Sequence, residues 1–364
     1  MTATEVASSA TERLVGRIFT AGVEAAELCT VYLGVHLGLY RALAQSPATA
    51  AELAARTSCD ERYLLEWLQG QAVAGLLTVD GVDPTTARFA LADGTYDVLV
   101  AETAPTYLGG LADIVAAAGR VLPQLVAAYR TGDGVPYSAY GPDGVGAQSA
   151  LNRPAFVNSL VAEWLPQMPD LLARLRDTAH PARVADLGCG TGWAAIELAK
   201  AFPHIAVDGR DNDEVSIAIG RANAVDQRVS DRVSLEVVDI ADESADWSPR
   251  YDLAMFVECV HDFPRPVEAL RHARAATRPG GTVLVVDERA AETFTAPGDE
   301  VERFFAAASA IWCLPQGRVG PDPEPVGTLI RPQTMRDLAH RAGYTGVQIV
   351  PIDHPFWRFY RLTP

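Results

Sequence analysis

A glycine-rich segment at residues 184–192, Val-Ala-Asp-Leu-Gly-Cys-Gly-Thr-Gly, stands between an expected strand and an expected helix. Because Gly188, Gly190 and Gly192 carry no Cβ atom, a ligand can approach the backbone, and the free amides that open the helix favour a negative group. Dinucleotide-binding proteins use a similar turn. Asp186, directly before the glycines, would repel a pyrophosphate and instead favours a ligand with a positively charged amino acid part.

Two further carboxylates follow the next two expected strands. Asp211 lies 23 residues beyond Gly188, where an acidic side chain can bind a ribose diol. Asp239 can accept a hydrogen bond from an adenine amino group while Ile240 packs on the ring. Each Asp taken alone is also explained as a helix cap or a turn residue. Three carboxylates at three successive strand ends, joined to the glycine turn, predict one ligand-binding crevice.

The segment Glu258-Cys-Val-His-Asp262 follows the fourth expected strand of this region and holds the candidate catalytic residues. His261 titrates in the range suited to taking a proton from a phenol or hydroxyl, although it could equally serve only in packing. Asp262 could orient the imidazole or cap the helix that starts near Pro264. Glu258 is a candidate for substrate binding or for a structural hydrogen bond.

Four aromatic side chains are candidates for contact with an aromatic or polyketide-like acceptor, although aromatic residues at helical spacing are usually core. They are Trp164, Phe304, Phe305 and Trp312. No His, Cys and Asp cluster has the spacing of a metal site, and His261 and Asp262 have no further ligand nearby in the sequence. We therefore expect no bound metal.

Strand and helix patterns alternate beyond Pro181. The expected strands are 182–187, 205–210, 233–238, 253–257, 282–287, 347–351 and 356–362, and the expected helices are 193–202, 213–224, 266–276 and 332–342. A turn at Pro279-Gly-Gly281 precedes the fifth of these strands. This alternation predicts an α/β fold with a Rossmann-like, doubly wound parallel sheet.

The first hundred residues predict a mainly helical, winged-helix arrangement. An apolar-periodic stretch at 14–44 is followed by the capping box Thr49 to Glu52 and by Asp60, each opening a short helix. A hairpin then forms from 76–79 and 87–91 around a turn at Asp80-Gly81.

The chain is thus expected to have three parts. These are a winged-helix dimerisation domain at 1–100, a helical linker and pocket wall at 101–180, and a ligand-binding domain at 181–364. Breaks in the helical linker are expected at Pro123 and in the Gly/Pro/Tyr-rich loop 131–146. The apolar face between residues 14 and 43 predicts a homodimer.

Charge and composition exclude several functions. The 364 residues carry a formal charge of −16, and residues 12–102 hold six arginines against twelve acids, which argues against a nucleic-acid partner. The five cysteines are widely spaced and fit a reduced, cytoplasmic protein. Residues 1–15 show no signal-peptide pattern, and no membrane-spanning segment is expected.

The segment Asp186 to Gly192, Asp211, Asp239 and the Pro279-Gly-Gly281 turn resemble the class I S-adenosylmethionine-dependent methyltransferases over roughly residues 150–364. The winged helix and the Glu258 to Asp262 segment narrow the resemblance to small-molecule O-methyltransferases, in which the N-terminal domain is a dimerisation platform. The catalytic histidine of that type stands in a His-Asp-Trp setting, whereas the third residue here is Phe263.

The resemblance implies S-adenosylmethionine as cofactor, S-adenosylhomocysteine as product and a hydroxyl of a secondary metabolite as acceptor. It implies that the cofactor-binding residues are Asp186, Gly188, Cys189, Gly190, Gly192, Asp211, Asn212, Asp239 and Ile240, and that the catalytic candidates are His261, Glu258 and Asp262. The runs 311–315 and 354–362 resemble a bacterial branch with mixed substrates.

Three other readings are compatible with the motifs. Methylation of carbon or nitrogen shares every residue named above. A relative that uses the bound sulfonium only electrostatically would also keep the cofactor site. A winged-helix regulator that senses a ligand is disfavoured by the acidic N-terminal region.

Overall fold

The computed structural model describes residues 9–364, so the expectation of no signal peptide falls partly on residues 1–8, outside this range. The chain divides into two compact units, the first ending at Ala116 and the second running from Ala117 to Pro364. The division falls inside helix α6, Gly110–Thr131.

The first unit is a winged helix. Its elements in order are α1 Ala10–His36, α2 Leu39–Gln45, α3 Ala50–Thr57, α4 Glu61–Val73, β1 Leu77–Asp80, β2 Arg88–Leu91 and α5 Thr95–Leu99. The capping box at Thr49 and Glu52 is present, and Asp60 caps α4 by accepting a hydrogen bond from the Tyr63 amide. Strands β1 and β2 pair antiparallel and form the wing.

The wing loop is longer than the expected turn at Asp80-Gly81. It spans residues 81–87, and Asp83 organises it. The Asp83 carboxylate accepts from the amide and hydroxyl of Thr85, and its carbonyl accepts from the Ala87 amide at 2.8 Å. An Asx-type turn therefore replaces the tight hairpin turn.

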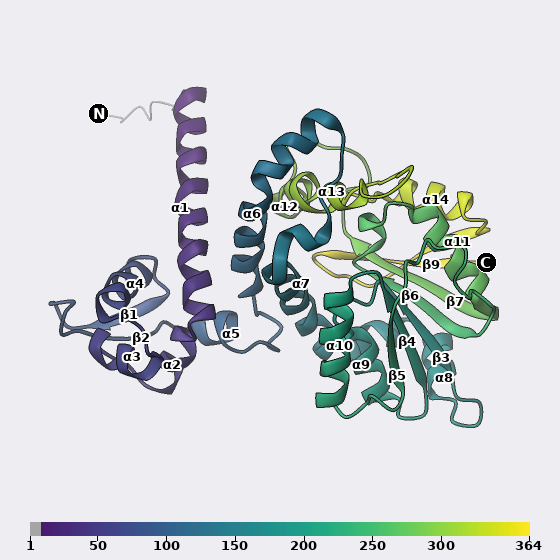
Figure 1. Cartoon of the computed structure of the whole chain (residues 1–364), viewed down its shortest axis with the longest axis horizontal. Coiled ribbons are helices and arrows are strands. Elements are labelled where there is room, and N and C mark those ends of the chain that lie inside the picture. The colour runs from purple at the N-terminus through teal and green to yellow at the C-terminus, as the bar shows by residue number, and fades with distance from the viewer. Residues whose placement is uncertain (1–8) are drawn as a thin grey trace, which may run out of the picture. The chain divides into compact units, whose positions relative to one another are not determined.

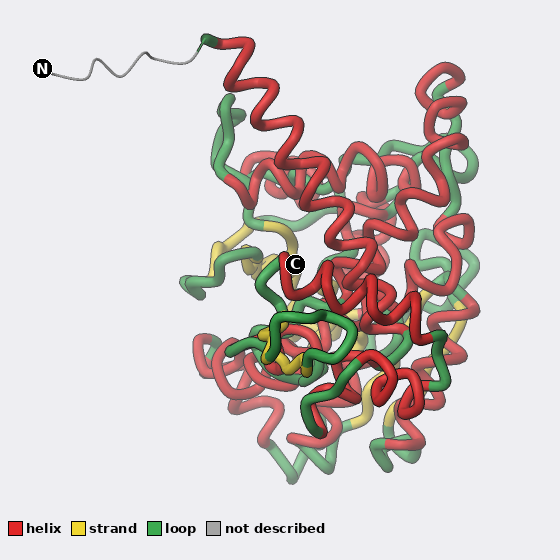
Figure 2. The backbone as a smooth tube through the Cα atoms, turned by 90° about the vertical axis from the view of Figure 1, so that its left-hand side faces the viewer, coloured by secondary structure: helices red, strands yellow, loops and turns green. Residues whose placement is uncertain are grey.

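Helix α1 presents an exposed apolar face. Leu14, Val15, Ile18 and Phe19 are all more than half exposed, and Phe19 reaches 73%. Figure 2 shows α1 as one unbroken helix. By length and composition alone α1 and α6 are apolar enough to cross a membrane, a test that core helices and signal sequences also pass.

The helical stretch that leads into the sheet differs from expectation at Pro123, where α6 continues instead of breaking. The buried side chains of Val121 and Leu125 hold the helix on both sides of the proline, which offsets the lost hydrogen bond. The elements that follow are η1 Tyr137–Tyr140, α7 Gly141–Ala155, η2 Phe156–Trp164, η3 Leu165–Gln167 and α8 Pro169–Arg176.

The second unit contains the predicted α/β sheet. Its strands are β3 Arg183–Leu187, β4 Ala206–Asp211, β5 Val233–Val237, β6 Tyr251–Val257, β7 Thr277–Glu288, β8 Gly346–Val350 and β9 Trp357–Thr363. They lie in the order β5-β4-β3-β6-β7-β9-β8, with the first five parallel and β9 antiparallel to both of its neighbours. Strand β7 starts earlier than expected, because the Pro279-Gly-Gly281 segment lies inside the strand. There it shifts the register of the pairing between β7 and β6.

Helices cover both faces of this sheet (Figure 1). One buried cluster joins one face to η2, α8, α9 Trp193–Ala201 and α10 Glu214–Asp226, and the other joins the opposite face to α11 Pro266–Ala276 and α14 Pro332–Arg341. The remaining elements are η4 Val260–Asp262, α12 Glu300–Ala308, η5 Ser309–Cys313 and α13 Leu314–Gly317. Strand order reverses between β3 and β6, the point where doubly wound sheets bind ligands.

Candidate active site

A pocket opens beyond the carboxyl ends of β3 and β6, at this reversal point. From the sheet side its wall includes Asp186, Gly188, Cys189, Gly190 and Glu258. Five of the residues predicted to bind cofactor or act in catalysis therefore lie in one pocket. The geometry agrees with the rule that parallel strands present ligand sites at their carboxyl ends.

Gly188 allows the loop after β3 to pack closely against the loop after β6. Its φ is +76°, and a Cβ atom there would lie 2.7 Å from Cys259 Sγ. Without that atom, the Cys259 thiol donates to the Leu187 carbonyl at 3.2 Å. The connection from β6 to η4 consequently packs directly against the glycine turn, which places Glu258 beside it.

Asp211 holds the glycine turn from the end of β4. One carboxylate oxygen accepts from the Gly190 amide at 2.8 Å, and the other accepts from the Asp213 amide at 2.9 Å. Burial raises the pKa of Asp211, although these amide hydrogen bonds oppose the rise. A Cβ atom on Gly190 would meet nothing within 4 Å, so this part of the turn faces open space.

Asp186 lies at the bottom of the pocket and is 2% exposed. Burial raises its pKa to about 7, against a hydrogen bond from the Ala195 amide. Its Oδ2 atom has no hydrogen-bond partner among the described residues. A buried, unpartnered carboxylate oxygen beside open glycine backbone fits a ligand that carries an ammonium group.

The other predicted adenosine contacts lie at neighbouring strand ends, outside the pocket wall. Asn212 is exposed. Asp239 is exposed, pairs with Arg265 at 3.7 Å and accepts from the Ala241 amide at 2.8 Å. Ile240 is buried in the core under α11.

Helix α7 supplies a pocket wall that sequence reasoning located only as a segment. Ser149 shares a hydrogen bond of 2.8 Å with the Thr191 hydroxyl and accepts from the Trp193 indole at 3.2 Å, which ties α7 to the glycine turn. Asn152 and Tyr137 also face the pocket. No short motif marks these residues, because contacts more than 40 residues apart bring them to the site.

His261 lies behind the pocket wall in a buried cluster of carboxylates and is 1% exposed. Its Nδ1 atom lies 2.7 Å from Asp287 Oδ1 and 2.8 Å from Glu288 Oε2, and its Nε2 atom lies 3.5 Å from Asp262 Oδ1. Burial alone would lower the pKa of His261, but the charges of Glu288, Asp287 and Asp262 outweigh it and raise the pKa well above 6.5. These neighbours therefore favour the protonated form of the imidazole.

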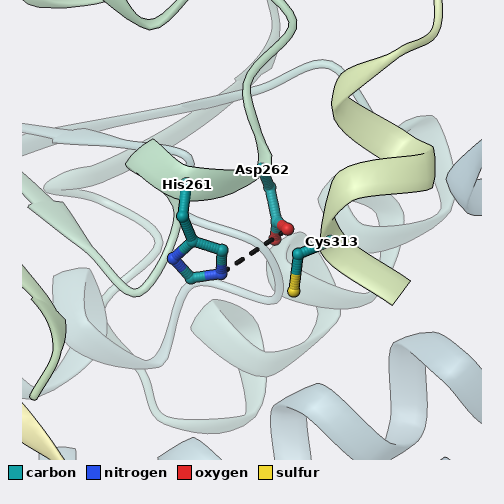
Figure 3. Close-up of side chains that lie close together, drawn as sticks. All are labelled: His261, Asp262 and Cys313. Atoms are coloured by element: carbon teal, nitrogen blue, oxygen red, sulfur yellow. Dashed lines mark ion pairs between the residues drawn. The ribbon is translucent and has the colours of Figure 1, made fainter. Parts of the chain in front are cut away.

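The opposite side of the imidazole faces Cys313. Figure 3 shows His261 and Asp262 on η4 and Cys313 on the neighbouring helix, with the three side chains pointing toward one another. One nitrogen, oxygen or sulfur atom from each of the three side chains lies within 4.8 Å of the other two. The fold therefore brings Cys313 to His261 and Asp262, a neighbour that the sequence spacing did not reveal. Burial raises the pKa of Cys313 to about 12, so the thiol keeps its proton. Burial also raises the pKa of Glu288 and of Asp262, although the charge of His261 opposes both rises. The absence of a metal stays a prediction.

The four aromatic acceptor candidates occupy different surroundings. Trp164 is 1% exposed and packs edge-on against Trp357 and Phe359 in the core, while Trp312 packs on Tyr140 at 4.2 Å. Phe305 is buried and Phe304 is half exposed on α12. None of the four is part of the described pocket wall.

A doubly wound sheet with a glycine turn after β3 and acidic residues at or just beyond the carboxyl ends of β3, β4 and β5 is typical of the S-adenosylmethionine-dependent methyltransferases. A family model described as a methyltransferase domain matches residues 161–349, more than half of the chain. The chain therefore belongs to this methyltransferase family. A second model, the Rv2258c-like winged HTH domain, matches residues 25–99.

Relatives and solved structures agree with this assignment. The chain is 26% identical to the ubiquinone biosynthesis O-methyltransferase of Hydrogenovibrio crunogenus, over 61% of this chain and 82% of that protein. This chain spans between 8% and 82% of the length of individual curated relatives.

Two solved structures have the same fold over nearly the whole chain. The mitomycin 7-O-methyltransferase MmcR has a TM-score of 0.68 and 19% identity, covering 97% of this chain and 98% of that one. Human N-acetylserotonin methyltransferase, solved in complex with S-adenosylmethionine, has a TM-score of 0.65 and 18% identity, covering 99% of both chains.

The close approach at Gly188 predicts a stability effect. Gly188→Ala places a side chain at positive φ and against Cys259, so we expect the free energy of unfolding to fall by about 2 kcal/mol or more. Gly119→Ala, at an open helical position, is the control and should be neutral or stabilising by about 0.5 kcal/mol. Urea unfolding measures both, and equal stabilities of the two variants would contradict the contact.

The raised pKa of Asp186 predicts a dependence of stability on pH. Its folded pKa of about 7 lies above the unfolded value, so between the two the unfolded chain ionises first and stability falls as pH rises. From about pH 5.5 to about pH 7, the wild type should lose about 2 kcal/mol relative to Asp186→Asn. Urea unfolding at both pH values, with exposed Asp231→Asn as control, tests this, and a constant difference would refute it.

Proposed function

We propose that this methyltransferase transfers a methyl group from S-adenosylmethionine to a hydroxyl oxygen of a small organic molecule, of the kind found in secondary metabolism. The observation that carries the proposal is the pocket at the β3 and β6 ends, where the glycine turn meets two carboxylates that have no basic partner. The names of the relatives support oxygen as acceptor, since a ubiquinone O-methyltransferase and a mitomycin 7-O-methyltransferase are among them.

The cofactor, when bound, supplies a methyl group on a positively charged sulfur. In this proposal Asp186 binds its ammonium group, and the turn held by Asp211 lies along its amino acid part and ribose. Helix α7 lines the other side of the pocket, where Ser149 accepts a hydrogen bond from the indole of Trp193 at the start of α9. Alignment and desolvation by these residues contribute the acceleration that methyl transfer requires.

His261 is the candidate base in this proposal, and its surroundings restrict when it can act. The imidazole must first lose a proton that Glu288, Asp287 and Asp262 stabilise. A base role therefore requires pH above neutral, where the neutral imidazole becomes populated. Asp287 and Glu288 contact the ring at Nδ1, so proton transfer would use Nε2, which lies 3.5 Å from Asp262 Oδ1 and faces Cys313.

We also propose a homodimer in the cytoplasm. The exposed apolar side chains of α1 favour burial against a second copy, as the resemblance to O-methyltransferases with a dimerisation domain implies. All five cysteines are free thiols, which suits a reducing compartment.

Cofactor binding is tested by titration calorimetry with S-adenosylmethionine and S-adenosylhomocysteine. Asp211→Asn removes an acceptor for the Gly190 or Asp213 amide, so we expect affinity for both compounds to fall at least about tenfold. The control Asp231→Asn, exposed and far from the turn in the fold, should bind like the wild type. An unchanged affinity in Asp211→Asn would remove this residue from the cofactor site.

The base assignment is tested by following S-adenosylhomocysteine formation with a panel of phenolic and keto-acid acceptors. His261→Gln should lower the rate about 100-fold or more and abolish its rise above neutral pH. His180→Gln, which changes an exposed histidine, is the control. Full activity in His261→Gln would favour an acceptor that needs no deprotonation, such as nitrogen or an activated carbon.

The dimer is tested by light scattering. The wild type should scatter as twice the chain mass of 38.9 kDa, and the double variant Ile18→Glu and Phe19→Glu should scatter as a monomer. Val82→Glu changes an exposed apolar side chain in the wing loop and should leave the mass unchanged. A monomeric wild type, or a wild type that sediments with membranes, would overturn this proposal.

A further inference from the structure

Glu258 occupies a backbone conformation that few side chains adopt. It follows β6 with a φ of +57°, and its amide donates to the Val286 carbonyl at 2.7 Å. A non-glycine residue in the left-handed region is strained, and such strain persists where the surroundings hold it in place. Here the hydrogen bond to β7 and the packing of Cys259 on Gly188 fix the backbone on both sides of the residue.

The carboxylate of Glu258 lines the pocket and forms no ion pair with an Arg or Lys among the described residues, while the charge of His261 acts on it from behind the pocket wall. Its Oε2 atom is buried and has no hydrogen bond among the described residues, and no Arg or Lys pairs with it there. Buried Asp252, in contrast, pairs with Arg174 at 2.9 Å and Arg278 at 3.2 Å. An unneutralised buried carboxylate is costly unless a ligand supplies the opposite charge.

The pocket thus holds two unpaired carboxylates, and the cofactor of the proposed function carries two positive charges. One charge is the ammonium group of its amino acid part, for which Asp186 is the candidate. The other is the sulfonium, which becomes a neutral thioether in the product. Only an interaction with the sulfonium can distinguish the two forms by charge.

We propose that Glu258 is the counter-charge of the sulfonium and makes the pocket bind the methyl-bearing cofactor in preference to its neutral product. This inference rests on the proposed use of S-adenosylmethionine. It assigns a specificity role to a residue that the glycine turn does not reveal. The same interaction weakens when the methyl group leaves, which favours release of the product.

Proton linkage gives this proposal a measurable signature. Burial raises the pKa of Glu258 to about 7; the Trp357 and Asn152 side chains and the charge of His261 oppose the rise, and Asp287 adds to it. A cation bound beside the carboxylate favours its ionised form, so binding near neutral pH releases a proton. Asp186 also titrates in the pocket, but it faces a charge that both ligand forms share.

The test is titration calorimetry of the full chain with S-adenosylmethionine and S-adenosylhomocysteine at about pH 6 and about pH 8. In the wild type the ratio of the two affinities should shift toward S-adenosylmethionine by about tenfold at the higher pH. In Glu258→Gln the ratio should be independent of pH and should no longer favour the charged form. Asp186→Asn, the matched control, should weaken both ligands alike.

A second measurement uses the wild type alone. Repeating the titration near neutral pH in two buffers of different ionisation enthalpy should show proton release with S-adenosylmethionine beyond that with S-adenosylhomocysteine. Equal proton release, or a ratio that Glu258→Gln leaves unchanged, would overturn the role of Glu258 while the cofactor assignment stands. Failure of both compounds to bind the wild type would instead overturn the proposed function, and this inference with it.

Discussion

The site depends on how closely two loops can approach at the reversal point of the sheet. Gly188 is the point of contact, because any side chain there would meet Cys259 within 3 Å. The thiol reaches the Leu187 carbonyl only across this gap. Together with the pairing of β3 and β6 in the sheet, this contact sets the end of β6 against the turn after β3, and Glu258 lines the same pocket as Asp186.

Burial of charge divides the site into two electrostatic parts. Around His261, the imidazole lies within 3.5 Å of three carboxyl groups, although Asp262 Oδ1 and Asp287 Oδ2 have no hydrogen-bond partner among the described residues. In the pocket, Asp186 and Glu258 have no basic group at such a distance among the described residues, and burial raises the pKa of each to about 7. The first part is a preorganised support, whereas the second is completed by what binds. A positively charged ligand would therefore supply the counter-charge that these two carboxylates lack in the empty pocket.

The fold was predictable where local pattern and global packing agree. The expected strand 205–210 and helix 266–276 match β4 and α11 to within a residue at each end. Their buried positions recur with the period of the element, and capping residues mark several helix starts. Prediction failed where tertiary contacts outweigh a local signal. Pro123 lies inside a helix because Val121 and Leu125 are buried on either side of it.

The site, too, was predictable only where local sequence determines it. Its two halves therefore differ in how well the sequence predicts them. The cofactor half follows partly from local sequence, since Asp186 and the glycines follow one strand, although Asp211 reaches the Gly190 amide from the end of the next strand, 21 residues away. The opposite wall comes from α7 and η1, and the partner of His261 at Cys313 is 52 residues distant. No spacing rule links such positions, because only the folded chain brings them together. The glycine turn and its carboxylates are thus a motif that many methyltransferases can share, so it carries little information about which acceptor is methylated.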